Sequence, residues 1–135
     1  MKVFNLLNQA FCLLFITGIY SCSNSQTTSN WTQFRSDNLS GISPNPVPVK
    51  WSDSINISWK TPIHGEGWSS PVVYGNQVWI TTASEDGKAL FGVCTDFSTG
   101  KIIQDIKLIE PDTVYQKHAI NSYATPTPCI EEGSV

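Results

Sequence analysis

The stretch Cys94–Gln104, with the sequence CTDFSTGKIIQ, constrains the fold of this chain more than any other segment. The carboxylate of Asp96 can accept hydrogen bonds from the backbone N–H groups of the residues that follow, which starts a tight turn. Gly100 can adopt the positive φ that lets the chain reverse its direction. The stretch therefore predicts a turn between two consecutive β-strands, the second of which covers Lys101–Leu108.

Runs of residues typical of β-strands surround this turn, and short turn signals separate them. Gly75-Asn76 is a two-residue hairpin signal of the primed turn types, and Asp86-Gly87 stands where a second reversal is needed. Apolar Val78 and Ile80 alternate with other residues, as expected of a strand whose two faces meet different neighbours. The predicted strands are Ser70–Tyr74, Gln77–Ala83, Lys88–Thr95 and Lys101–Leu108. They predict an antiparallel sheet without a helix, which fits a propeller blade or a meander in a β-sandwich.

The turn motif resembles the repeat A-x-D-x-x-T-G-K-x-x-W of the pyrroloquinoline-quinone-like (PQQ-like) β-propellers. Two positions depart from the repeat, because Cys94 replaces the Ala and Gln104 replaces the Trp, so the docking role of that Trp is lost. The positions that match are Asp96, Thr99, Gly100 and Lys101. The resemblance implies an all-β fold of the quinoprotein alcohol dehydrogenase-like type, a β-propeller of four-stranded antiparallel blades.

The segment that begins at Trp31 also resembles the opening of secreted members of this family, which often begin with W-x-Q-F-R. Trp31, Phe34 and Arg35 match that pattern, whereas Ser36 replaces the usual Gly. The family resemblance further implies that Asn56–Lys60 is a strand that joins the last blade and closes the ring, since such pairing removes an exposed edge.

Internal repetition supports the propeller prediction, since PVVYGNQV at Pro71–Val78 aligns without gaps with PCIEEGSV at Pro128–Val135. The long segment Ile109–Ala124 would then connect two blades. A propeller needs about four to eight blades of roughly 40–50 residues each. Because 135 residues cannot supply them, we expect an N-terminal fragment with only the first one to two blades. A single blade leaves apolar faces uncovered, so this piece alone should be unstable or prone to aggregation.

The N-terminus has the pattern of a bacterial lipoprotein signal. Lys2 precedes the apolar stretch Ala10–Tyr20, and Cys22 follows it as the expected lipid-attachment residue. The alternative is an ordinary secretory signal, with an unmodified Cys22. The expected organisation is a signal peptide over 1–21, a polar tether and extended segment over 22–50, and a partial propeller over 51–135. We therefore expect a periplasm-facing membrane lipoprotein of the cell envelope, or a secreted protein if Cys22 carries no lipid.

The cysteines and histidines give little indication of chemistry. Cys94 and Cys129 are interpreted as small buried apolar residues rather than a disulfide. His64 with Glu66 is a weak metal pattern because a second His is missing. His118 and Asn121 lie in the predicted connection between blades and are candidates for a ligand-facing loop, although such residues more often satisfy backbone groups. We predict no catalytic and no metal-binding residue.

Two functional classes remain, because a propeller fold hosts many activities. The first is a non-catalytic binding or scaffold module, with a protein partner or small ligand on the propeller face, a membrane contact through the lipid anchor and no cofactor. The second is part of a quinoprotein dehydrogenase, for which the resemblance would imply pyrroloquinoline quinone and calcium. The tether and the altered motif favour the first class. The formal net charge of −3 disfavours nucleic acid as a partner.

Overall fold

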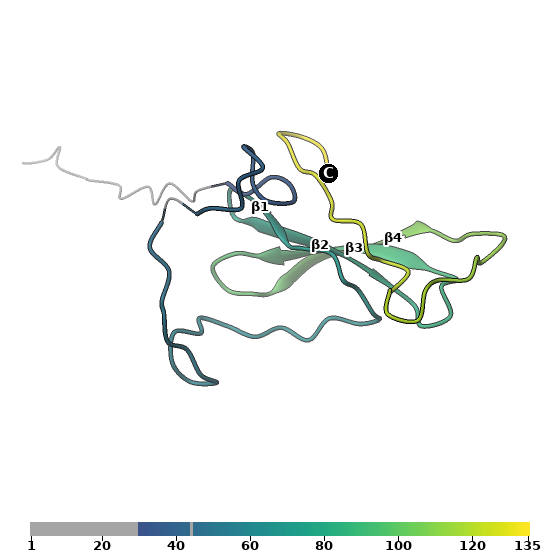
Figure 1. Cartoon of the computed structure of the whole chain (residues 1–135), viewed down its shortest axis with the longest axis horizontal. Helices are drawn as coiled ribbons and strands as arrows, with labels where there is room; N and C mark the ends of the chain where they lie inside the picture. The colour runs from purple at the N-terminus through teal and green to yellow at the C-terminus, as the bar shows by residue number, and fades with distance from the viewer. Residues whose placement is uncertain (1–29, 44) are drawn as a thin grey trace, which may run out of the picture.

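The structure is a computed structural model that describes residues 30–43 and 45–135. Within these residues the chain forms one antiparallel sheet of four strands in sequential order, without a helix (Figure 1). The strands are β1 (Val72–Tyr74), β2 (Gln77–Ala83), β3 (Leu90–Asp96) and β4 (Ile102–Ile109). The predicted all-β sheet and its three reversals are therefore confirmed. The predicted signal peptide, Cys22 and the start of the tether lie outside the described residues.

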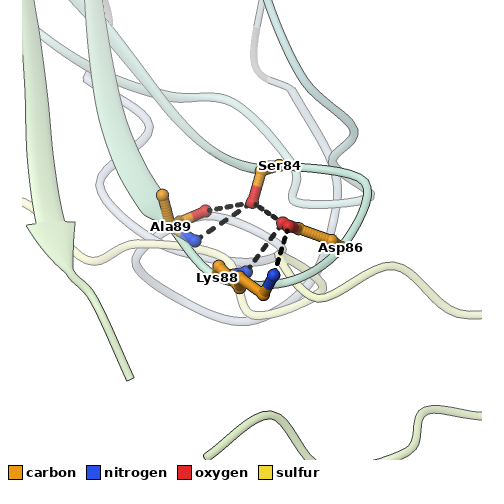
Figure 2. Close-up of polar contacts among 4 residues, drawn as sticks. All are labelled: Ser84, Asp86, Lys88 and Ala89. Atoms are coloured by element: carbon orange, nitrogen blue, oxygen red, sulfur yellow. Dashed lines mark hydrogen bonds and ion pairs between the residues drawn. The ribbon is translucent and has the colours of Figure 1, made fainter. Parts of the chain in front are cut away.

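The turn between β2 and β3 is closed by side chains as well as by the backbone, as Figure 2 shows. The Ser84 hydroxyl donates to Asp86 Oδ1 at 2.7 Å, and the backbone N–H of Lys88 donates to the same oxygen at 3.1 Å. These two hydrogen bonds, the one from Ser84 first, hold the pKa of Asp86 below its ordinary value because they stabilise the carboxylate. The following Gly87 has a φ of 72°, which only glycine adopts without strain. The predicted Asp86-Gly87 reversal is confirmed.

One face of the sheet holds the apolar core. Val72 on β1 pairs with Trp79 on β2, which pairs with Cys94 on β3, which pairs with Gln104 on β4. Directly paired residues project to the same face, and Val72, Trp79 and Cys94 form one buried cluster with Ile130. We call this surface the Trp79 face. Ile130 comes from the predicted second repeat, so residues of two repeats share one core.

The opposite face is covered by the segment that precedes β1. Thr61 Oγ1 donates to the carbonyl of Gly100 at 2.5 Å, and Trp59 Nε1 donates to the carbonyl of Phe97 at 2.8 Å. The covered Val93 is fully buried on this face. The segment Asn56–Lys60 pairs with no strand of the described sheet and contacts the turn between β3 and β4 through side chains. Because its expected partner is the last blade, which is not among the described residues, the ring-closing strand stays a prediction.

The second repeat begins with the same local structure as the first. Glu131 bridges Ser134 across a two-residue turn, as Tyr74 bridges Gln77 at the aligned positions. Gly133 in the second turn has a φ of 84°. The N-terminal segment connects the two repeats, because Trp31 pairs with Val73 and the backbone N–H of Ile130 donates to the carbonyl of Thr32 at 2.8 Å. The repetition seen in the sequence is thus also a repetition of backbone conformation.

The outer strand β4 is the least protected element of the sheet. All of its residues are exposed, and within the described residues it pairs only with β3. Many of these exposed side chains are large and apolar, with Ile103 at 50% and Leu108 at 55% of full exposure. An exposed apolar edge strand invites pairing with other chains. The sheet therefore presents a surface that is suited to a neighbouring element.

Candidate functional site

The repeat motif folds into a turn held by Asp96. Its Oδ1 accepts the backbone N–H of Thr99 at 2.7 Å and the Thr99 hydroxyl at 2.8 Å, while Asn76 Nδ2 donates to Oδ2. The hydroxyl of Thr99 first, and then its N–H, hold the pKa of Asp96 below its ordinary value. The backbone N–H of Asp96 donates to the carbonyl of Lys101 at 2.8 Å, and Gly100 has a φ of 71°. Asp96, Thr99, Gly100 and Lys101 thus act together as one turn.

A tryptophan from another part of the chain packs on this turn. A Cβ atom placed on Gly100 would lie 2.5 Å from Cδ2 of Trp59 and 2.8 Å from Oγ1 of Thr61. Gly100 is therefore needed for its small size as well as for its φ. Trp59 had no predicted role of its own, because the family repeat has its Trp at the position that Gln104 occupies. The available signal was a tryptophan within the expected strand Asn56–Lys60.

His118 and Asn121, the candidates for a ligand-facing loop, lie together in an exposed turn. The backbone N–H of Asn121 donates to the carbonyl of His118 at 2.9 Å, and His118 Nδ1 accepts the N–H of Ile120 at 3.4 Å. The hydrogen bonds that His118 makes here are therefore local and satisfy the backbone. The neighbouring Tyr123 fixes the loop to the sheet, because its ring lies 2.8 Å from a Cβ placed on Gly87, while Lys117 Nζ lies 5.4 Å from the centre of that ring.

The histidine near the sheet has a partner that the sequence did not reveal. His64 Nε2 lies 2.9 and 3.0 Å from the two carboxylate oxygens of Asp105 on β4, rather than pairing with Glu66. Its ring meets Phe91 edge to face at a centroid distance of 4.6 Å. The carbonyl of His64 accepts the hydroxyl of Thr82 at 2.7 Å. These three contacts attach the segment that precedes β1 to β2, β3 and β4. His64 and Asp105 are 41 residues apart in the sequence, so no local pattern indicates their pairing.

Two hollows beside the sheet are larger than a third of about 200 Å³ near His64. The first, which we call the turn groove, has a volume of about 680 Å³. Its lining residues are Asn56, Ile57, Ser58, Trp59, Gly75, Asn76, Phe97 and Ser98. The second is a cleft of about 600 Å³ on the Trp79 face, between Ile106 of β4 and the hairpin that follows Ile130. Gln104 lines this cleft, at the position where the family repeat has its Trp.

The two cysteines of the described chain are free thiols that differ in environment. Cys94 is buried, and burial raises the pKa of its thiol because the thiolate loses solvation. Cys129 is exposed, so the expectation that it is buried is wrong. Its aligned residue Val72 is buried by the neighbouring strand β2, whereas the second hairpin has no such neighbour in the described structure.

Within residues 30–43 and 45–135, no three His, Cys, Asp or Glu side chains gather in a way that could hold a metal ion. The same residues contain no helix that is long and apolar enough to cross a membrane. No family model, curated protein or solved structure matches this chain.

Proposed function

We propose that this chain belongs to an exported PQQ-like β-propeller that acts as a non-catalytic binding or scaffold module in the cell envelope. The observation that carries the proposal is the second hairpin, which repeats the β1–β2 turn and inserts Ile130 into the core of the first sheet. In a propeller, consecutive four-stranded sheets of the chain pack face to face around a ring. The described sheet would be the first blade, and the hairpin would begin the second.

The exposed surface of β4 fits this arrangement. In a propeller each blade covers the faces of its neighbours, so apolar residues on both faces of the outer strand are expected. Ile103 and Ile106 both lie on β4 and are both exposed. The cleft beside Gln104 would receive the rest of the second blade, with Gln104 in place of the family's Trp.

The proposed location follows from the N-terminal signal. Cys22 would carry the lipid, and the polar residues after it would connect the anchor to the sheet. The protein would then face the periplasm from a membrane, by our proposal the outer membrane, or would be secreted if Cys22 is unmodified. A protein partner or small ligand would bind on the propeller face.

The second candidate is part of a PQQ-dependent quinoprotein dehydrogenase, which the turn motif favours by resemblance. Under that alternative, pyrroloquinoline quinone and calcium would be held by residues outside the described part of the chain. The imperfect motif at Cys94 and Gln104 and the expected lipid tether favour the non-catalytic class.

The two candidates are separated by a cofactor titration of the gene product, including whatever the gene encodes beyond the Val135 codon. The folded protein is titrated with pyrroloquinoline quinone and calcium while cofactor absorbance and dye reduction are recorded. The proposal predicts no saturable cofactor binding and no turnover. Saturable binding with dye reduction would instead establish an oxidoreductase.

A further inference from the structure

We propose that the turn groove is a binding site for a neutral oligosaccharide. This inference rests on the proposed binding function and names the ligand class for one site. The groove volume of about 680 Å³ lies within the range of roughly 300–1,000 Å³ that is typical of small-molecule sites. It is open on the surface and is built from three separate segments, the extended chain before β1 and the two hairpin turns at the same end of the sheet.

The residues of the groove combine aromatic rings with uncharged polar groups. Trp59 and Phe97 supply the rings, and 42% of Phe97 is exposed. An aromatic face offers an apolar surface to the C–H groups of a sugar ring, while amides and hydroxyls pair with its hydroxyl groups. None of the described residues that line the groove carries a charge. A neutral ligand rich in hydroxyl groups therefore fits better than an anion, a cation or a nucleotide.

The polar side chains of the groove keep both donors and acceptors available to a ligand. Asn56 Nδ2 donates one N–H to the carbonyl of Lys50 at 2.8 Å, which leaves its second N–H and its Oδ1 for other partners. Ser98 Oγ donates to Asn76 Oδ1 at 2.9 Å and keeps its lone pairs free to accept. Sugar hydroxyls both donate and accept hydrogen bonds, so they can pair with groups of either kind. An extended peptide would pair with a free strand edge instead, and the groove is formed by turns and an unpaired segment.

The groove is also held rigid by bonds between its walls. Trp59 Nε1 donates to the carbonyl of Phe97 at 2.8 Å, and the N–H of Phe97 donates to the carbonyl of Asn76 at 2.9 Å. Rigid walls reduce the entropy that is lost when a ligand binds.

The test is isothermal titration calorimetry of the gene product with maltotriose, cellotriose and N,N′,N″-triacetylchitotriose as separate probes. We expect saturable binding of at least one trisaccharide. Phe97→Ala should weaken that binding about tenfold, because the ring that stacks on the sugar is removed. Phe97→Tyr should restore the affinity. Tyr115→Ala is the matched control, since Tyr115 is an exposed aromatic residue outside the groove, and it should leave binding unchanged.

Two results would overturn the proposal. One is that none of the three trisaccharides binds a protein that the thermal unfolding curve shows to be folded. The other is that binding persists at full strength in both Phe97→Ala and Ser58→Ala, which would place the sugar elsewhere. Neither result bears on the proposed module itself, because the cofactor titration tests that proposal separately. Binding of an unrelated polar peptide in place of the sugars, with the same sensitivity to Phe97→Ala, would also reject the assigned ligand class.

Discussion

Replacing Gly100 with Ala tests whether the repeat turn is locked by Trp59. The backbone term comes from the φ of 71°, because an L-residue in the left-handed region costs roughly 1–2 kcal/mol. The steric term comes from the new Cβ, which would lie 2.5 Å from the indole of Trp59. Overpacking of this kind costs typically about 1–3 kcal/mol. Gly100→Ala should therefore lower the free energy of unfolding by about 2–5 kcal/mol in total.

The structure provides a matched control for this substitution. Gly75 also has a positive φ, of 56°, but a Cβ placed on it meets no atom within 4 Å. Gly75→Ala should therefore show only the backbone term of roughly 1–2 kcal/mol. Urea denaturation of the gene product, followed by circular dichroism, gives both free energies. In a Trp59→Ala background, the cost of Gly100→Ala should fall toward that of Gly75→Ala, and the Cβ contact with Thr61 Oγ1 at 2.8 Å should keep it somewhat higher. Equal costs for the two glycines in the unmodified protein would refute the packing of Trp59 on the turn.

The remaining predictions concern charge, thiols, the edge strand and the anchor. Because hydrogen bonds hold the pKa of Asp96 below its ordinary 3.8, its stabilising effect is complete above that value and is lost as the pH falls through the lowered pKa. Asp96→Asn should thus be less stable than the unmodified protein at neutral pH. In urea titrations at stepped pH, the difference should begin to shrink below 3.8 and should vanish only when the pH lies below the lowered pKa. In a chain that starts after Cys22, Ellman's reagent should modify exposed Cys129 quickly and buried Cys94 only upon unfolding, so a single fast phase of both thiols would contradict the core. Ile106→Lys on exposed β4 should reduce light scattering by the isolated residues 30–135, and unchanged scattering would count against an aggregating edge. Mass spectrometry of the mature protein should find a diacylglyceryl group on Cys22, whereas a plain residue there would indicate an ordinary secretory signal.

Local signals in the sequence predicted most of the sheet. The turn residues Gly75, Gly87 and Gly100 all have positive φ values, and each stands at a predicted reversal. Strand boundaries differ by only a few residues, with β3 over Leu90–Asp96 instead of Lys88–Thr95. Such features depend on the conformational preferences of neighbouring residues, so a single sequence contains enough information to place them.

Contacts between distant segments could not be predicted in the same way. The pair of His64 with Asp105 and the packing of Trp59 on Gly100 depend on how the covering segment crosses the sheet. No periodicity in the sequence encodes that path. Whether Asn56–Lys60 forms a strand depends in the same way on a distant pairing partner, which the described sheet does not supply. The turn groove depends on the same segment and was equally hidden.

The most direct test of the account is an experimental structure of the complete gene product. The account predicts that β1–β4 form one blade of a closed ring, that the hairpin at Glu131–Ser134 opens the next blade, and that this blade covers Ile106 and Gln104. A structure in which β4 continues into a larger sheet of a β-sandwich, with no ring of blades, would contradict the propeller and the function proposed for it.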